Sequence, residues 1–139
     1  MSRSVQAERL RIVVCEDDER LAELVVRLLD DDGRFVVVGQ AADGDEAVRL
    51  VEEHEPDLVL MDIGLPGRDG LAATRAIHEW DADRHVVIYT GSNEYADIAR
   101  SEEAGAVGFL HKDALASPDL PDALHVLHTN YMNRLPDEY

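Results

Sequence analysis

Residues 57–70 read DLVLMDIGLPGRDG, and this stretch decides the fold. It begins as an apolar run at 57–61, reaches a lone acid at Asp62 and continues into a loop rich in glycine and proline. A short apolar run bounded by turn residues is typical of a strand that is buried on both faces. The segment GLAATRAIHEW, residues 70–80, then has the apolar spacing of a helix. The stretch therefore predicts a strand, an acid at its carboxyl end, a loop and a helix.

Further apolar runs lie on either side of this stretch, at residues 10–15, 35–38, 86–89 and 107–110. Each is followed by an amphipathic segment; the first helix stops at Gly33, and the second begins near Asp43 and ends before Pro56. Repeated strand–helix units with strands apolar on both faces predict an α/β domain, because such strands need helices on both sides of a parallel sheet. Right-handed crossovers then favour a doubly wound five-stranded sheet in the order 2-1-3-4-5.

The length of 139 residues fits one domain, and no linker or low-complexity stretch interrupts the repeats. We expect a single domain over residues 1–139, with its core at about 9–129 and a frayed tail at about 130–139. His125 and His128 share a face of the last helix and are interpreted as surface residues. The one cysteine, Cys15, cannot form an internal disulfide, and the N-terminal segment lacks the apolar region of a signal peptide, so we expect a cytoplasmic protein.

The chain is strongly acidic, since 30 acidic and 13 basic side chains leave a formal net charge of −17. Binding to nucleic acid or to an anionic membrane needs clustered basic residues, so both are excluded as direct partners of this domain. Of the 13 basic residues, 12 are arginines and one is a lysine, Lys112. That lysine follows shortly after the fifth apolar run.

Polar residues gather where four of the predicted strands end. The residues after the first, third, fourth and fifth runs include, in order, Glu16 with Asp17, Asp62, Thr90 and Lys112. The ligand site of an open parallel sheet lies outside the carboxyl ends of its strands. We therefore expect three carboxylates, a hydroxyl and an ammonium in one crevice.

Three carboxylates in one crevice repel one another unless a cation lies among them. Oxygen ligands without His or Cys favour Mg2+ or Ca2+, and an open crevice suits Mg2+, which keeps several waters and takes other oxygens from a phosphate. An ammonium and a hydroxyl beside the metal can clamp phosphoryl oxygens. Asp62 stands alone at the end of a central strand and is the candidate nucleophile for an aspartyl phosphate, while Glu16 and Asp17 are candidate metal ligands.

These residues carry a family resemblance. The segments VVCEDDE, LVLMDIGLPGRDG, VVIYTG and GFLHKDA, with the helices between them, resemble response-regulator receiver domains of two-component signalling over residues 9–129. The segment GFLHKDA is most similar to that of receivers usually fused to a helix-turn-helix DNA-binding domain. The resemblance implies a flavodoxin-like (βα)5 fold and a phosphorylation-dependent switch. Such a protein is not an enzyme beyond its own phosphorylation and autodephosphorylation.

The resemblance also implies roles for the phosphorylation residues. Asp62 would accept a phosphoryl group from a sensor histidine kinase, a phosphotransfer protein or a small phosphodonor. Lys112 would contact the phosphoryl oxygens, and Thr90 would hydrogen-bond them in the active state. Phe109 would repack when Thr90 moves.

The metal and the remaining partners follow from the same resemblance. Mg2+ would be held by Asp17, Asp62 and the backbone carbonyl of Gly64, with Glu16 acting through water. The phosphorylated form would bind an output protein or a fused effector domain, which makes regulation of transcription one expected output. A second copy of the chain is a further expected partner.

Two positions depart from the family pattern: Asp113 follows the lysine where many receivers carry a proline, and the aromatic is Phe109 rather than a tyrosine. Three other functions stay open. A hydrolase of external phosphate esters would want a second acid at Gly64, and an FMN carrier would want a positive, hydroxyl-rich loop in place of EDDE at 16–19. A degenerate receiver would bind partners without being phosphorylated.

Overall fold

The computed structural model describes residues 9–91 and 95–134. Its strands are β1 (Leu10–Cys15), β2 (Phe35–Ala41), β3 (Leu58–Asp62), β4 (Val86–Thr90) and β5 (Gly108–His111). Its helices are α2 (Glu19–Asp32), α3 (Gly44–His54), α4 (Gly70–Trp80), α5 (Tyr95–Ala104), the short 3-10 helix η1 (Lys112–Ala116) and α6 (Leu120–Arg134). Strands and helices alternate, as the sequence pattern predicts.

The strands form one parallel sheet in the order β2-β1-β3-β4-β5, which confirms the predicted fold class and topology. Strand β3 lies at the centre, and all its residues are buried. Asp62, its last residue, pairs in register with Tyr89 of β4. The carboxyl ends of β1, β3 and β4 therefore meet at one edge of the molecule.

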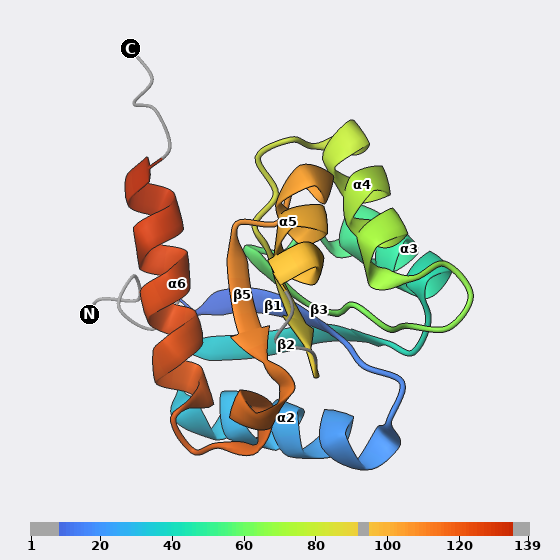
Figure 1. Ribbon diagram of the computed structural model, residues 1–139. Coiled ribbons are helices and arrows are strands. Elements are labelled where there is room, and N and C mark those ends of the chain that lie inside the picture. The colour runs from blue at the N-terminus through green and yellow to red at the C-terminus, as the bar shows by residue number, and fades with distance from the viewer. Residues whose placement is uncertain (1–8, 92–94, 135–139) are drawn as a thin grey trace.

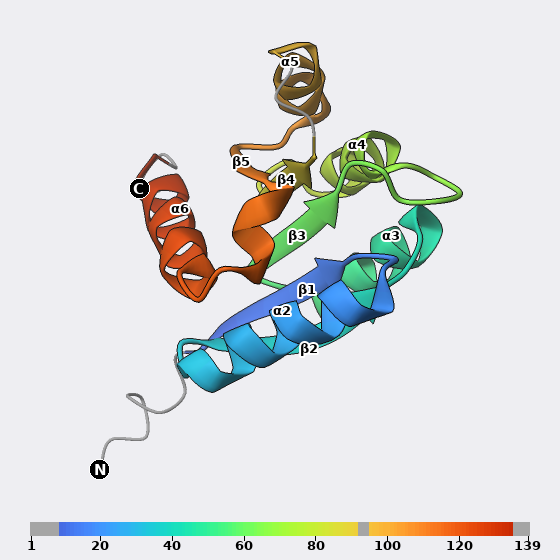
Figure 2. The ribbon, with the colours of Figure 1, turned by 60° about the horizontal axis from the view of Figure 1, so that its bottom comes forward.

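Helices cover both faces of the sheet (Figure 1). On one face, side chains of α3, α4 and α5 pack against the sheet in a core that includes Ala47, Ile77 and Ala104. On the other, α2 and α6 pack in a second core that includes Leu29 and Leu124. Figure 2 shows α2 lying along β1 and β2, with α6 beside it. Burial on both faces explains why the strand sequences are continuously apolar.

Short polar residues fix where the helices begin and end. Asp18, Asp43 and Asp69 are the N-caps of α2, α3 and α4, and each carboxylate accepts hydrogen bonds from backbone N–H groups of the first turn. Gly33 ends α2 in the left-handed conformation, with φ of 91°. The starts of α3 and α4, which follow the loops after β2 and β3, are therefore encoded by residues next to them in the sequence.

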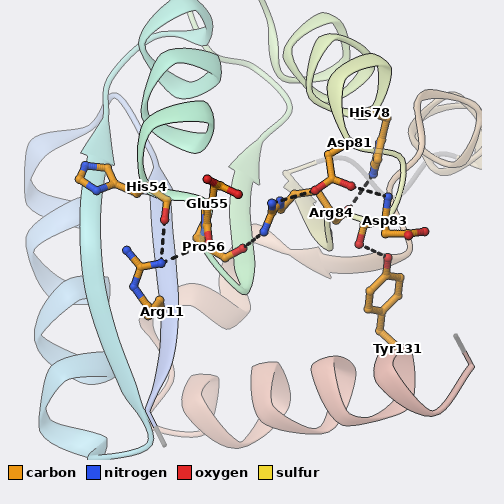
Figure 3. Close-up of polar contacts among 9 residues, drawn as sticks. All are labelled: Arg11, His54, Glu55, Pro56, His78, Asp81, Asp83, Arg84 and Tyr131. Atoms are coloured by element: carbon orange, nitrogen blue, oxygen red, sulfur yellow. Dashed lines mark hydrogen bonds and ion pairs between the residues drawn. The ribbon is translucent and has the colours of Figure 1, made fainter. Parts of the chain in front are cut away.

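At the amino ends of the strands, polar side chains join the elements to one another (Figure 3). The Arg11 guanidinium donates to the carbonyl of His54 at 2.7 Å, and that of Arg84 donates to the carbonyl of Pro56 and to Asp81. Tyr131 of α6 donates its hydroxyl proton to the carbonyl of Asp83. These contacts hold the edge of the sheet that lies opposite Asp62.

Helix α6 continues to Arg134, past residue 129, the predicted end of the core. The reason is burial: Tyr131 is 8% exposed and stacks on His85, with ring centroids 4.2 Å apart. His128 is also buried, and its Nδ1 lies 2.9 Å from Nδ1 of His85. The interpretation of His128 as a surface residue is therefore wrong. Residues 135–139 of the expected tail lie outside the described residues.

Candidate functional site

Asp62 is held at the end of β3 by its own loop. Its Oδ1 accepts a hydrogen bond from the backbone N–H of Gly64 at 3.0 Å, and the residue is only 5% exposed. The start of α4 crosses close to this point, because a Cβ added at Gly70 would lie 2.1 Å from the carbonyl oxygen of Asp62. A glycine at position 70 is therefore required for the loop to close over the end of the strand.

The three predicted carboxylates come together at this edge. Glu16, Asp17 and Asp62 each offer a carboxylate oxygen, and these oxygens lie within 4.8 Å of one another. Glu16 and Asp62 are buried, whereas Asp17 is exposed at the mouth of the site. The expectation that two strand ends supply one acidic cluster matches this geometry.

Lys112, the single lysine, reaches the same cluster from η1. Its Nζ lies 3.8 Å from Oδ2 of Asp62 and 3.8 Å from Oε1 of Glu16. Both distances are at the outer limit for an ion pair, and the lysine side chain is partly exposed. A compact ammonium at this position can approach a group that enters between it and Asp62.

Burial makes the charged form of both inner carboxylates less favourable. Burial raises the pKa of Asp62, against which the N–H of Gly64 and the charge of Lys112 act. Burial likewise raises the pKa of Glu16, and the hydrogen bond from Tyr89 opposes it. The hydrogen bonds of the site therefore offset only part of the cost of burying these carboxylates, and a cation among them would offset more of it.

The donor set fits Mg2+. It contains carboxylate oxygens and neither thiol nor imidazole, it is open on the side of Asp17, and its buried charge lacks full compensation. Among the described residues this is the one cluster of three or more potential ligands. Ligation by the carbonyl of Gly64 stays a prediction.

Thr90 lies in β4, one strand away from Asp62, and Phe109 lies in β5, the next strand along. They line a hollow of about 230 Å3 between β4, β5 and α5, which Ile98 and Ser101 also line. Phe109 is partly buried against the core on that face. The two residues expected to act as a switch thus share one space beside the same helix.

Sequence reasoning missed Tyr89. Its ring is fully buried beside Val87 in the second core, and its hydroxyl donates to Oε1 of Glu16 at 2.6 Å. Burial, followed by the contact with Glu16, raises the pKa of Tyr89 well above its ordinary range. A signal was present in the sequence, because a buried tyrosine hydroxyl usually has a hydrogen-bond partner, and VVIY places one inside an apolar strand.

The fold and the site define a class: a doubly wound α/β domain with an acidic cluster, a buried aspartate and a lysine at the carboxyl edge of its sheet. Comparison with known proteins agrees. The sequence-family model of the response regulator receiver domain matches residues 12–125 of this chain. The chain is 37% identical over 109 residues to the transcriptional regulatory protein NarL of Mycobacterium tuberculosis, covering 78% of this chain and 50% of that protein.

Two further comparisons cover nearly the whole length of a stand-alone relative and of a solved receiver domain. The chemotaxis protein CheY of Halobacterium salinarum is 33% identical over 114 residues, which are 82% of this chain and 92% of CheY. The solved receiver domain of M. tuberculosis NarL superposes with a TM-score of 0.82 at 32% identity, covering 88% of this chain and 98% of that domain.

The chain belongs to the response-regulator receiver family, and it is a signalling domain of two-component systems. Phosphorylation of an aspartate and Mg2+ binding at an acidic pocket are general features of this family, whose domains are in general signalling modules rather than catalysts. The chain spans about half the length of the NarL relatives that it matches. In the part of the chain that the structure describes, none of the helices has the length and apolar character to cross a membrane.

Proposed function

We propose that Asp62 is the phosphoacceptor of a Mg2+-dependent receiver, in which Lys112 contacts the phosphoryl group. The observation that carries the proposal is the convergence of Glu16, Asp17 and Asp62 within 4.8 Å, with Lys112 3.8 Å from Asp62. A nucleophilic carboxylate, a cation site and an ammonium are the groups that phosphoryl transfer needs.

In the transfer, a carboxylate oxygen of Asp62 forms a bond to phosphorus. The bond from phosphorus to the donor's imidazole nitrogen or acyl oxygen breaks, and its electron pair leaves with the donor. Lys112 stabilises the phosphoryl oxygens, and the N–H of Gly64 keeps the carboxylate oriented. Asp17, Asp62 and the Gly64 carbonyl would hold Mg2+, with Glu16 acting through water. The bound ion supplies positive charge that offsets the carboxylates and the phosphoryl group.

Phosphorylation would be read out through Thr90, Phe109 and α5. A phosphoryl group at Asp62 adds negative charge and acceptor oxygens, towards which the Thr90 hydroxyl would move. Phe109 would then shift into space next to α5, because both residues line the same hollow. The surface of α5, β5 and α6 would change as a result, and with it the partners of the domain.

We treat residues 1–139 as one receiver domain in the cytoplasm, phosphorylated by a sensor histidine kinase or a phosphotransfer protein. Its output would be an effector domain or a separate output protein, and a second copy of the chain is another partner of the same surface. The resemblance to NarL makes regulation of transcription the favoured output. The domain's own chemistry is limited to its phosphorylation and autodephosphorylation, because Gly64 supplies no acid for a hydrolase.

Intact-protein mass spectrometry tests the chemistry. Acetyl phosphate with Mg2+ should add the mass of one phosphoryl group, and Asp62→Asn should remove that gain. Asp113→Asn is the matched control, since its carboxylate lies beside Lys112 in sequence but its side chain is 94% exposed. If neither a small donor nor a phosphorylated kinase adds mass to the wild type, the proposal is wrong.

A further inference from the structure

Tyr89 connects the central sheet to the acidic cluster. It lies in β4, immediately before Thr90, and its side chain crosses the second core towards the end of β1. There its hydroxyl lies 2.6 Å from Oε1 of Glu16 and 3.0 Å from the carbonyl oxygen of Cys15. The hydroxyl carries one proton, and the shorter contact, to a carboxylate, is the stronger of the two.

The Glu16 carboxylate is held from two sides. Oε1 accepts from Tyr89, and Oε2 accepts from the backbone N–H of Asp18 at 2.9 Å. The side chain has no exposed surface, so it cannot gain these hydrogen bonds from bulk water. Among the contacts of the described residues, Lys112, at 3.8 Å, is what Oε1 would keep without the tyrosine hydroxyl. A buried carboxylate that loses the hydrogen-bond partner of one oxygen reorients or becomes disordered.

We propose that Tyr89 is a positioning residue of the cation site: its hydroxyl holds the Glu16 carboxylate towards Asp17 and Asp62 and thereby sets the affinity for Mg2+. This inference rests on the proposed function, because it takes the acidic cluster to be the Mg2+ site. Tyr89 itself does not touch the metal or the phosphoryl group. It acts through Glu16.

The size of the effect follows from the position of Tyr89 behind Glu16. Loss of a partner that orients a metal ligand typically weakens metal binding by about 10–100-fold. Glu16 is expected to act through water, so the lower end applies, and we expect Tyr89→Phe to raise the dissociation constant for Mg2+ about tenfold. The ring stays in place in this variant, which preserves packing against Val87 and its neighbours.

The protein offers a matched control in Tyr131. Like Tyr89, it is buried and its hydroxyl donates a hydrogen bond, but the acceptor is the backbone carbonyl of Asp83, at the amino ends of the strands (Figure 3). Tyr131→Phe likewise removes a buried tyrosine hydroxyl and its hydrogen bond, without touching the acidic cluster. It should lower thermal stability while leaving Mg2+ affinity within about twofold of the wild type.

The test is calorimetric titration of the intact chain with Mg2+ in the absence of any phosphodonor. It is paired with the rate of phosphorylation by acetyl phosphate at increasing Mg2+. For Tyr89→Phe we expect the tenfold weaker binding and a matching shift of the Mg2+ concentration for half-maximal rate, with a maximal rate within about threefold of the wild type. A merely structural role would lower stability and leave the Mg2+ dependence where it is. Tyr89→Leu, which also lacks the hydroxyl, should show the same shift and is measured if Tyr89→Phe does not fold.

The outcomes separate this inference from the function on which it rests. If the wild type binds Mg2+ and is phosphorylated, but the folded Tyr89 variants bind Mg2+ within twofold of it, the positioning role is wrong and the receiver function stands. If the wild type neither binds millimolar Mg2+ nor gains a phosphoryl group, both are wrong.

Discussion

Acidification should weaken the attachment of α6 to the sheet through His85. This residue lies immediately before β4 and is 2% exposed; its Nδ1 pairs with Nδ1 of His128, and its ring stacks on Tyr131. Its Nε2 has no hydrogen-bond partner among the described residues, so a proton there would be a buried N–H without an acceptor. Burial, then the nearby His128 and Arg134, lowers the pKa of His85 from 6.5 to about 3.

The sign and size of the effect follow from that pKa. Below pH 6.5 the unfolded chain binds a proton at His85, whereas the folded chain does not until about pH 3, so stability is present at neutral pH and falls with acidification. Between about pH 7.5 and about pH 5 the loss from this one group is about 2 kcal/mol. Burial also lowers the pKa of His128, which adds in the same direction, although the charge of Asp57 opposes it.

Urea unfolding followed by circular dichroism at the two pH values measures the loss. The double variant His85→Phe with His128→Phe removes both titrating partners and keeps two flat rings. From about pH 7.5 to about pH 5 the wild type should therefore lose about 2 kcal/mol more of its free energy of unfolding than the double variant does. His54→Gln, in which a histidine of α3 is replaced, is the control and should behave as the wild type. Equal pH dependence in the wild type and the double variant would refute the assignment.

Two further changes probe the site. Gly70→Ala places a Cβ 2.1 Å from the carbonyl oxygen of Asp62, so it should lower the free energy of unfolding by more than about 2 kcal/mol and abolish phosphorylation. Gly91→Ala is the control: its Cβ meets open space, so the free energy of unfolding should stay within about 0.5 kcal/mol of the wild type. Urea unfolding measures the stability of both variants, and mass spectrometry measures their phosphorylation. Lys112→Met removes the cation 3.8 Å from Glu16 and Asp62, so Mg2+ should bind more tightly in a calorimetric titration while phosphorylation slows. Unchanged or weaker Mg2+ binding by Lys112→Met would contradict this account of the charge balance.

Strand order and the place of the site could be predicted because they depend on patterns that repeat along the chain. Apolar runs separated by helices give a parallel sheet, and parallel strands bring Glu16, Asp62 and Lys112 to one edge whatever their side chains contact. Asp43 and Gly33 could also be read as helix ends, because a cap acts within one turn of its own helix. All of this information is local or topological.

Contacts across the core could not be predicted in the same way. The sequence shows that His128 shares a helix face with His125, but not that His85 of another element faces it. The order of residues 130–134 could not be predicted for the same reason, since Tyr131 is held by the ring of His85 and by the carbonyl of Asp83. Pairing of side chains 40 or more residues apart depends on rotamers and distances that composition does not carry.

The residues that were missed nevertheless follow one rule. Val87 and Tyr89 project from the same face of β4, as does His85 immediately before the strand, because side chains alternate along extended backbone; the polar residues stand at either end of an apolar stretch. Each polar group finds a partner only in the observed register: the Tyr89 hydroxyl at Glu16 and the His85 ring at His128. A shift by one residue would turn both to the opposite face and bury them without those partners, which is costly for a hydroxyl and for an imidazole. The polar ends of β4 therefore specify its register, and one of them also orients a carboxylate of the acidic cluster.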